Sequence, residues 1–146
     1  MLARKVMGSG GELLNLLASE IQASLADLND DEFSPLLLKA LAEWQAITAE
    51  VGAACADDVN ELGSAAVDYL MMGGYIVLGW MWAKMAVVAK QKILVQDDGF
   101  YRSKLATARF YFQKILPRTL THAALIRAGA GAVMCLSDDD MLSYQQ

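Results

Sequence analysis

The sequence YLMMGGYIVLGWMWAK, residues 69–84, decides the fold, together with FYFQKILPRTL, residues 110–120. The first segment is apolar, aromatic and rich in glycine, and Tyr69–Ala83 carries no charge over fifteen residues. A membrane-spanning helix needs about 20 apolar residues, whereas a shorter run is typical of a buried core helix. Asp68 and Lys84 limit the run on either side. The segment therefore predicts the central helix of a bundle, with no membrane as a partner.

Apolar residues at helical spacing predict two helices before this centre. The first, Glu12–Asn29, places one apolar stripe on a single face: Leu14, Leu17, Ile21, Leu25 and Leu28. The second begins at Ser34-Pro35, because a serine side chain can cap free N–H groups and a proline in the first helical position loses no hydrogen bond. Its buried seam is predicted to comprise Leu37, Leu41, Trp44, Thr48, Val51 and Cys55.

The central helix is predicted to run from about Asp57-Asp58 to about Val95. A fourth helix begins near Gly99, and Pro117 kinks or ends it at Leu116 because proline lacks the N–H that a helix interior needs. Thr119–Leu136 continues as a kinked extension or as a fifth helix. One face of the fourth helix is predicted to hold Tyr101, Leu105, Ala108, Phe112 and Ile115. No strand-like alternation occurs, so the fold class is all-α, an up-and-down bundle of four long helices.

The charges are segregated along the chain. Residues 1–68 hold twelve acidic and three basic side chains. Residues 99–137 hold no acid and six bases: Arg102, Lys104, Arg109, Lys114, Arg118 and Arg127. The favoured interpretation is attraction between acidic early helices and a basic late helix. The alternative is a basic face that binds an acidic partner or the phosphates of a ligand.

Reactive side chains show no catalytic or metal-binding pattern. His122 has no second histidine or carboxylate at helical spacing, which favours a structural or surface role over a metal site. Gly8–Gly11 lacks the Lys-Ser/Thr of a phosphate-binding loop. Cys55 and Cys135 are predicted to be reduced thiols packed in the core. Without an apolar leader at the N-terminus, the expected location is cytoplasmic, and no nucleic-acid partner is expected.

Three segments carry a resemblance to a known family. Residues 72–86 (MGGYIVLGWMWAKMA), 100–112 (FYRSKLATARFYF) and 115–119 (ILPRT) resemble the C-terminal helical domain of a subfamily of acyl-CoA dehydrogenases. This subfamily includes the 3-methylmercaptopropionyl-CoA dehydrogenases. Arg4-Lys5 and Gly10-Gly11 are similar to the joint between the catalytic core and that domain. The resemblance covers essentially the whole chain and is closest over residues 69–131.

The resemblance implies an accessory domain that is inactive alone. Residues 1–11 would be a linker from a missing catalytic core, residues 12–137 the helical-bundle domain, and residues 138–146 a tail. The family's FAD site, acyl-CoA pocket and general base lie in the preceding domains, so no catalytic, cofactor-binding or metal residue is carried over to this chain. FAD is expected in the parent enzyme, and the expected partners are its catalytic domains and further copies in a homo-oligomer.

A candidate interface with the catalytic core follows from the aromatic and basic residues of the opening stretch. It comprises Trp80, Trp82, Arg102, Arg109 and Arg118. Two other functions stay open at this point. One is a freestanding helical scaffold that self-associates through its apolar face. The other is a small-ligand carrier that uses the bundle core, with the basic helix at its mouth.

Overall fold

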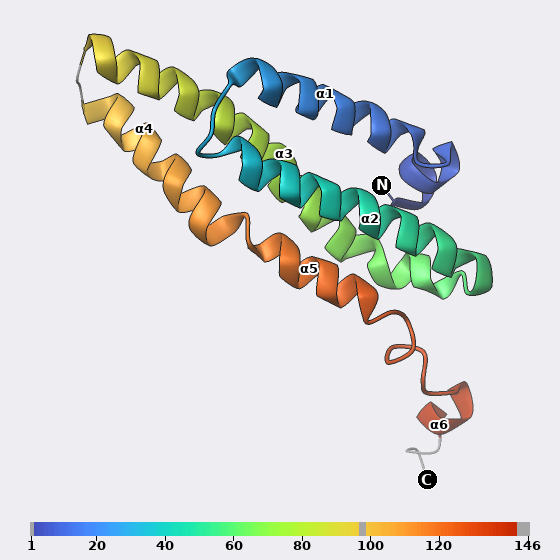
Figure 1. Cartoon of the computed structure of the whole chain (residues 1–146). Helices are drawn as coiled ribbons and strands as arrows, with labels where there is room; N and C mark the ends of the chain where they lie inside the picture. The colour runs from blue at the N-terminus through green and yellow to red at the C-terminus, as the bar shows by residue number, and fades with distance from the viewer. Residues whose placement is uncertain (1, 97–98, 143–146) are drawn as a thin grey trace.

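Four helical rods run side by side in the part of the chain that the computed structural model describes, residues 2–96 and 99–142 (Figure 1). Short π and 3-10 turns, η1 (Leu2–Val6) and η2 (Met7–Ser9), precede the first rod, and residues 2–96 and 99–142 contain no strand. The rods are α1 (Glu12–Leu28), α2 (Ser34–Asp57), α3 (Asn60–Val95), and α4 (Gly99–Phe110) continued by η3 (Tyr111–Ile115) and α5 (Arg118–Arg127). Successive rods reverse direction, so the predicted all-α, up-and-down bundle is confirmed.

The third rod, α3, is the centre of the bundle and packs against α2, α4 and α5. Two glycines on its buried face allow side chains of α2 to approach the α3 backbone closely. A Cβ on Gly73 would lie 2.6 Å from the Trp44 ring, and one on Gly79 would lie 3.0 Å from Leu37. These glycines therefore serve contact between α2 and α3 rather than backbone freedom.

By length and composition, α3 is the one helix within residues 2–96 and 99–142 that could cross a membrane. The central helix of a bundle in water has the same composition, so this property does not distinguish the two settings. One third of its most apolar window, 33%, is buried inside the bundle. The rest of that window is partly buried or exposed.

The buried faces of the first two rods agree with the predicted stripes. Leu14, Ile21 and Leu25 of α1 are buried, while Leu17 and Leu28 pack at the edge of the core. In α2 the buried residues include Leu37, Leu41, Trp44, Thr48 and Val51, with Cys55 partly buried. Helical periodicity identifies these faces because residues three and four apart project to the same side.

The start of α2 at Ser34 agrees with the prediction, but the residue that caps it does not. Ser34 lies inside the first turn and its buried Oγ has no hydrogen-bond partner, so the predicted serine cap is wrong. Asp30 takes over this role, since its Oδ2 accepts a hydrogen bond from the backbone N–H of Phe33 at 2.7 Å. The buried Phe33 occupies the N-cap position, so Ser34 and the proline both lie in the first helical turn.

Pro117 changes the helical geometry of the turn that precedes it in the fourth rod. The α-helix ends at Phe110, and one wider turn follows in which the N–H of Leu116 bonds to the carbonyl of Tyr111 at 2.9 Å. An α-helical turn would bring the proline ring against the carbonyl four residues earlier, and a π turn relieves that contact. The break near Leu116 is therefore confirmed, with α5 continuing in nearly the same direction (Figure 1).

The α5 helix ends at Arg127, so the predicted helix to Leu136 is wrong beyond that residue. Gly129 adopts φ +72°, a left-handed conformation that ends the helix. Glu61 of α3 accepts a hydrogen bond from the Ala130 N–H at 3.0 Å and replaces the lost helical partner. Cys135 consequently lies on the surface, and its predicted place in the core is also wrong. A short helix, α6 (Asp138–Leu142), follows.

Candidate functional site

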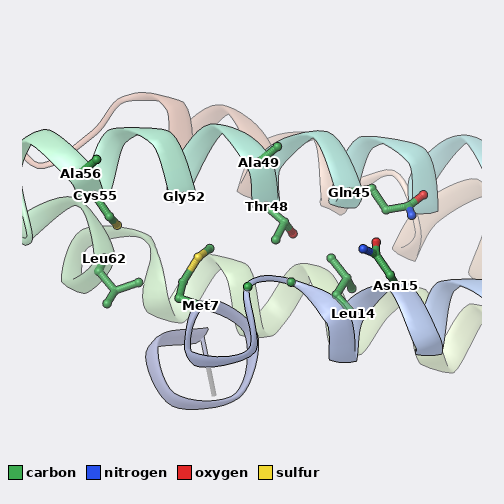
Figure 2. A pocket seen from close by; sticks show the side chains of 12 residues that line it. Met7, Leu14, Asn15, Gln45, Thr48, Ala49, Gly52, Cys55, Ala56 and Leu62 are labelled. Atoms are coloured by element: carbon green, nitrogen blue, oxygen red, sulfur yellow. The ribbon is translucent and has the colours of Figure 1, made fainter.

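A cavity of about 560 Å³ lies where the N-terminal turns meet α1 and α2 (Figure 2). Its walls come from Met7 and Gly10-Gly11 before α1, from the first turn of α1, from the second half of α2, and from Leu62 of α3. The left-handed φ values of the two glycines, +60° and +87°, turn the chain so that Met7 projects toward α2. The cavity thus depends on the segment that precedes the first long helix.

The polar groups of this cavity are uncharged: the amides of Asn15 and Gln45, the hydroxyl of Thr48 and the thiol of Cys55. The Thr48 hydroxyl already has two hydrogen-bond partners. It donates its one proton to the Trp44 carbonyl at 2.8 Å and therefore accepts a hydrogen bond from the Tyr69 hydroxyl at 2.7 Å. Burial raises the pKa of the Cys55 thiol, with the nearby carboxylates adding to the effect. The thiol therefore stays protonated and is a poor nucleophile.

The cavity fits a small neutral molecule better than a nucleotide cofactor. FAD carries a pyrophosphate, which proteins bind with cationic side chains or helix N-terminal N–H groups, and no lysine or arginine lines this cavity. The described lining residues therefore offer no cationic side chain to a pyrophosphate. The carrier hypothesis placed the basic helix at the mouth of a ligand pocket, but the six basic residues of 99–137 are absent from these walls.

The basic late helix and the acidic early helices are joined by ion pairs, as the charge segregation predicts. Arg109 of α4 donates to Glu32, with Nε 2.6 Å from Oε1 and Nη2 3.3 Å from Oε2. Lys90 of α3 lies 2.9 Å from the same carboxylate. The Arg109 hydrogen bond is the main reason that the pKa of Glu32 lies below its ordinary value. Arg127 pairs in the same way with Glu43 and Glu50 of α2.

The two tryptophans of the predicted core interface lie on different sides of α3. Trp80 donates a hydrogen bond to Ser24 of α1 at 2.9 Å, whereas the Trp82 ring packs on Tyr111 of η3 with ring centroids 6.3 Å apart. Lys84 lies over the Trp80 ring at 4.9 Å. Both indoles are partly buried within the bundle, so they act at least in part as contacts between helices.

The three arginines of that predicted interface are exposed on the fourth rod. Arg102 and Arg109 belong to α4 and Arg118 begins α5. Arg109 is committed to Glu32, as described above. Across residues 2–96 and 99–142, the structure gives Arg118 no ion pair. Trp80 thus faces α1, whereas Trp82 packs against the rod that carries the three arginines.

His122 makes a structural contact. Its Nδ1 lies 2.7 Å from Asp68 Oδ1, and its ring stacks on Tyr75 with centroids 5.6 Å apart. This arrangement ties α5 to α3. Within the described ranges no group of three or more histidine, cysteine or carboxylate side chains could hold a metal ion.

One known protein family matches most of this chain. A family model described as acetyl-CoA dehydrogenase C-terminal like matches residues 17–137, from α1 to the end of the coil after α5. The chain belongs to this family. No match was found among curated proteins.

The acetyl-CoA dehydrogenase C-terminal-like match covers most of α1 and all of the other three rods, so the family assignment and the helical bundle agree. Sequence reasoning missed the cavity of Figure 2. Its available signals were Gly10-Gly11, which shape the turn, and Gly52, which opens the α2 wall toward Met7. These signals are weak because a glycine pair also fits a plain linker, and only the burial of Leu2 and Val6 shows that the segment packs on the bundle.

Proposed function

We propose that this chain is an accessory C-terminal domain of a FAD-dependent acyl-CoA dehydrogenase, of the subfamily that includes the 3-methylmercaptopropionyl-CoA dehydrogenases. The family match over residues 17–137 carries the proposal. The domain packs on the catalytic core of the enzyme and supplies neither the flavin site nor the base. FAD then belongs to the catalytic domains, which supply the α,β-oxidation of the acyl-CoA.

The chemistry of the described residues supports an accessory role. The cavity beside α1 holds amides, a hydroxyl and a protonated thiol, none of which removes a proton from a carbon at neutral pH. The carboxylates Glu32, Glu43 and Glu50 are engaged by lysine and arginine. Asp68 is likewise held by His122. These groups stabilise the bundle rather than act on a substrate.

The exposed face of the fourth rod is the proposed contact with the catalytic core. Phe110 and Leu120 of this rod are 57% and 60% exposed, and Arg118 at the start of α5 is exposed as well. Exposed aromatic and arginine side chains are enriched in protein interfaces. Of the interface residues predicted from the sequence, this surface includes Arg118 but neither tryptophan. Its apolar part consists of exposed residues of α4 and α5.

The test mixes the purified chain with the FAD-loaded catalytic core of the parent dehydrogenase, expressed separately. We expect the chain alone to bind no flavin and to oxidise no acyl-CoA with an artificial electron acceptor. We expect complex formation by calorimetry, weakened at least tenfold by Arg118→Glu with Leu120→Glu. Leu16→Glu on the exposed side of α1 is the matched control. Lack of binding between chain and core, with both folded, would refute the proposal.

The alternative is a freestanding helical scaffold that self-associates. It predicts oligomers of the chain that have no affinity for any dehydrogenase core. The same mixing experiment distinguishes the two functions, because binding to the core is required by one and excluded by the other.

A further inference from the structure

One face of α3 carries an apolar stripe that no described helix covers. Its residues follow one another at alternating intervals of four and three: Val67, Met71, Gly74, Leu78, Met81, Met85 and Val88. The exposed fractions of the six side chains range from 37% at Met81 to 71% at Val67. At Gly74, an added Cβ would meet nothing within 4 Å. The helices that pack on α3 therefore leave most of this face exposed, and α4 borders it only at Met85 and Val88.

The stripe is long and continuous. From Val67 to Val88 it extends about 32 Å along the helix axis, at 1.5 Å per residue. Alternation of three and four is the spacing by which helices pack side by side over several turns. A continuous apolar surface of this kind marks an interaction site on a protein in water.

The order of residues in the stripe indicates what covers it. Read from its N-terminal end, the stripe is Val, Met, Gly, Leu, Met, Met, Val, and read from its C-terminal end it is Val, Met, Met, Leu, Gly, Met, Val. It is thus nearly palindromic about Leu78. In a two-fold symmetric interface each residue i that contacts j is matched by j contacting i, so antiparallel packing of two such stripes pairs like with like.

We infer that the chain forms a two-fold dimer in which the Val67–Val88 stripe of α3 packs antiparallel on the same stripe of a second copy. Leu78 lies at the axis. Val67 of one copy then lies near Val88 of the second copy, and Met71 near the second copy's Met85, within about one residue of register. This inference goes beyond the proposed function, which assigns a different surface to the catalytic core.

The one mismatch in the palindrome is complementary in shape. Gly74 leaves an open hollow on the stripe, and the position that faces it across the axis is Met81. A methionine side chain is long and flexible and fills irregular gaps. Each of the two hollows of the dimer therefore receives one methionine from the other copy.

The helix dipoles favour the antiparallel direction. Antiparallel packing places the N-terminal end of each α3 beside the C-terminal end of the other copy's α3, whereas parallel packing would place like dipole ends together.

Cysteine cross-linking tests the dimer and its direction at once. The background is the full chain with Cys55→Ala and Cys135→Ser. We expect Leu78→Cys to form a disulfide-linked dimer under mild oxidation, because the two thiols meet at the axis. Val88→Cys alone is expected to stay monomeric in denaturing gels, since its two copies lie about 30 Å apart across the axis. A mixture of Val67→Cys and Val88→Cys is expected to cross-link.

Light scattering on the unmodified chain supplies the second readout. We expect twice the 15.8 kDa chain mass at high concentration, and the monomer mass for Leu78→Glu, which places two carboxylates at the axis. Leu78 is 53% exposed, so this variant keeps the helical circular dichroism spectrum. Leu16→Glu, on the exposed side of α1, is the matched control and stays dimeric.

Three results would overturn the inference. The first is a monomer at every concentration of the unmodified chain. The second is self-cross-linking of Val88→Cys, which indicates parallel packing. The third is flotation of the chain, but not of Leu78→Glu, with phosphatidylcholine vesicles, which assigns the stripe to a lipid surface.

Discussion

Gly73 is the residue at which the packing of this domain is most tightly determined. It lies on the buried face of α3, and the Trp44 ring of α2 occupies the volume that a side chain would need. The Trp44 ring packs on the ring of Tyr69, with centroids 5.6 Å apart. The Tyr69 hydroxyl is hydrogen-bonded to Thr48. A shift of the indole would therefore disturb a buried hydrogen bond as well as a close contact.

We expect Gly73→Ala to destabilise the chain by about 1–3 kcal/mol, because its Cβ would lie 2.6 Å from a ring carbon that has little room to move. Gly63→Ala is the matched control, since the same helix has open space there. It should leave stability unchanged or raise it by up to about 1 kcal/mol through helix propensity. Urea unfolding followed by circular dichroism measures both. Equal stability of the two variants would contradict the close contact.

At the scale of elements, Glu32 connects three parts of the bundle. It lies in the turn between α1 and α2 and pairs with Lys90 of α3 and Arg109 of α4. Asp30 in the same turn also accepts a hydrogen bond from Lys90, at 2.5 Å. The turn is thereby held against the point where α3 and α4 lie side by side (Figure 1).

These ion pairs predict a pH dependence below the ordinary pKa of Glu32, 4.5. Because the folded pKa is lowered, the unfolded chain takes up the proton first. The stabilisation is complete above 4.5 and is lost as pH falls through the folded pKa. We expect the free energy of unfolding to fall less steeply in this range for Glu32→Gln than for the unmodified chain. Arg109→Gln should reduce the slope in the same direction, and unchanged slopes in both variants would be the contrary result.

Element boundaries show which parts of the fold are predictable from local sequence. The ends of α1 and α3 follow from the apolar periodicity and from Asp58, whose Oδ1 accepts the Asn60 N–H at 2.9 Å. The cap of α2 does not follow, because the choice between Ser34 and Asp30 depends on the burial of Phe33 by other helices. The end of α5 depends similarly on Glu61, which accepts a hydrogen bond from the N–H of Ala130, sixty-nine residues later in the sequence.

At the scale of the whole molecule, the two ends of the described chain differ in how they attach. Leu2 and Val6 are 2% and 5% exposed and belong to the core. After Ala130, the described side chains up to Leu142 are exposed. The N-terminal segment thus contributes to stability, while the segment after Ala130 lies outside the bundle.

We expect removal of residues 1–6 to cost roughly 3–6 kcal/mol, the value of burying two aliphatic side chains. Removal of residues 131–146 should change stability by less than about 0.5 kcal/mol, because it leaves the core and the Glu61 contact in place. Thermal unfolding of the two truncated chains makes the comparison. A larger loss from the C-terminal truncation would show that the segment after Ala130 has an undetected role.

The candidate sites were harder to predict than the fold. Periodicity identifies which face of a helix is buried, but α3 is apolar on nearly every side, so the sequence alone does not separate its core residues from the exposed stripe. The cavity beside α1 is formed by backbone turns and by the absence of side chains, which leave little trace in the sequence. The charge pairing was predictable, because the acids and bases lie in different halves of the chain.

The wide turn Tyr111–Ile115 has a consequence for how length changes in this domain are tolerated. A π turn contains about one residue more than the α-helical turn it replaces. Loss of a single residue there, such as the exposed Gln113, would convert it to a regular turn and keep α4 and α5 in phase. It would also bring the ring of Pro117 back against the carbonyl four residues earlier, so the deletion requires loss of the proline as well. The same deletion within Val67–Val88 of α3 would rotate every later side chain by about 100° and turn the stripe away from its face. Related chains that lack this proline are therefore expected to be one residue shorter at the first place, whereas related chains in general are expected to keep a constant length at the second.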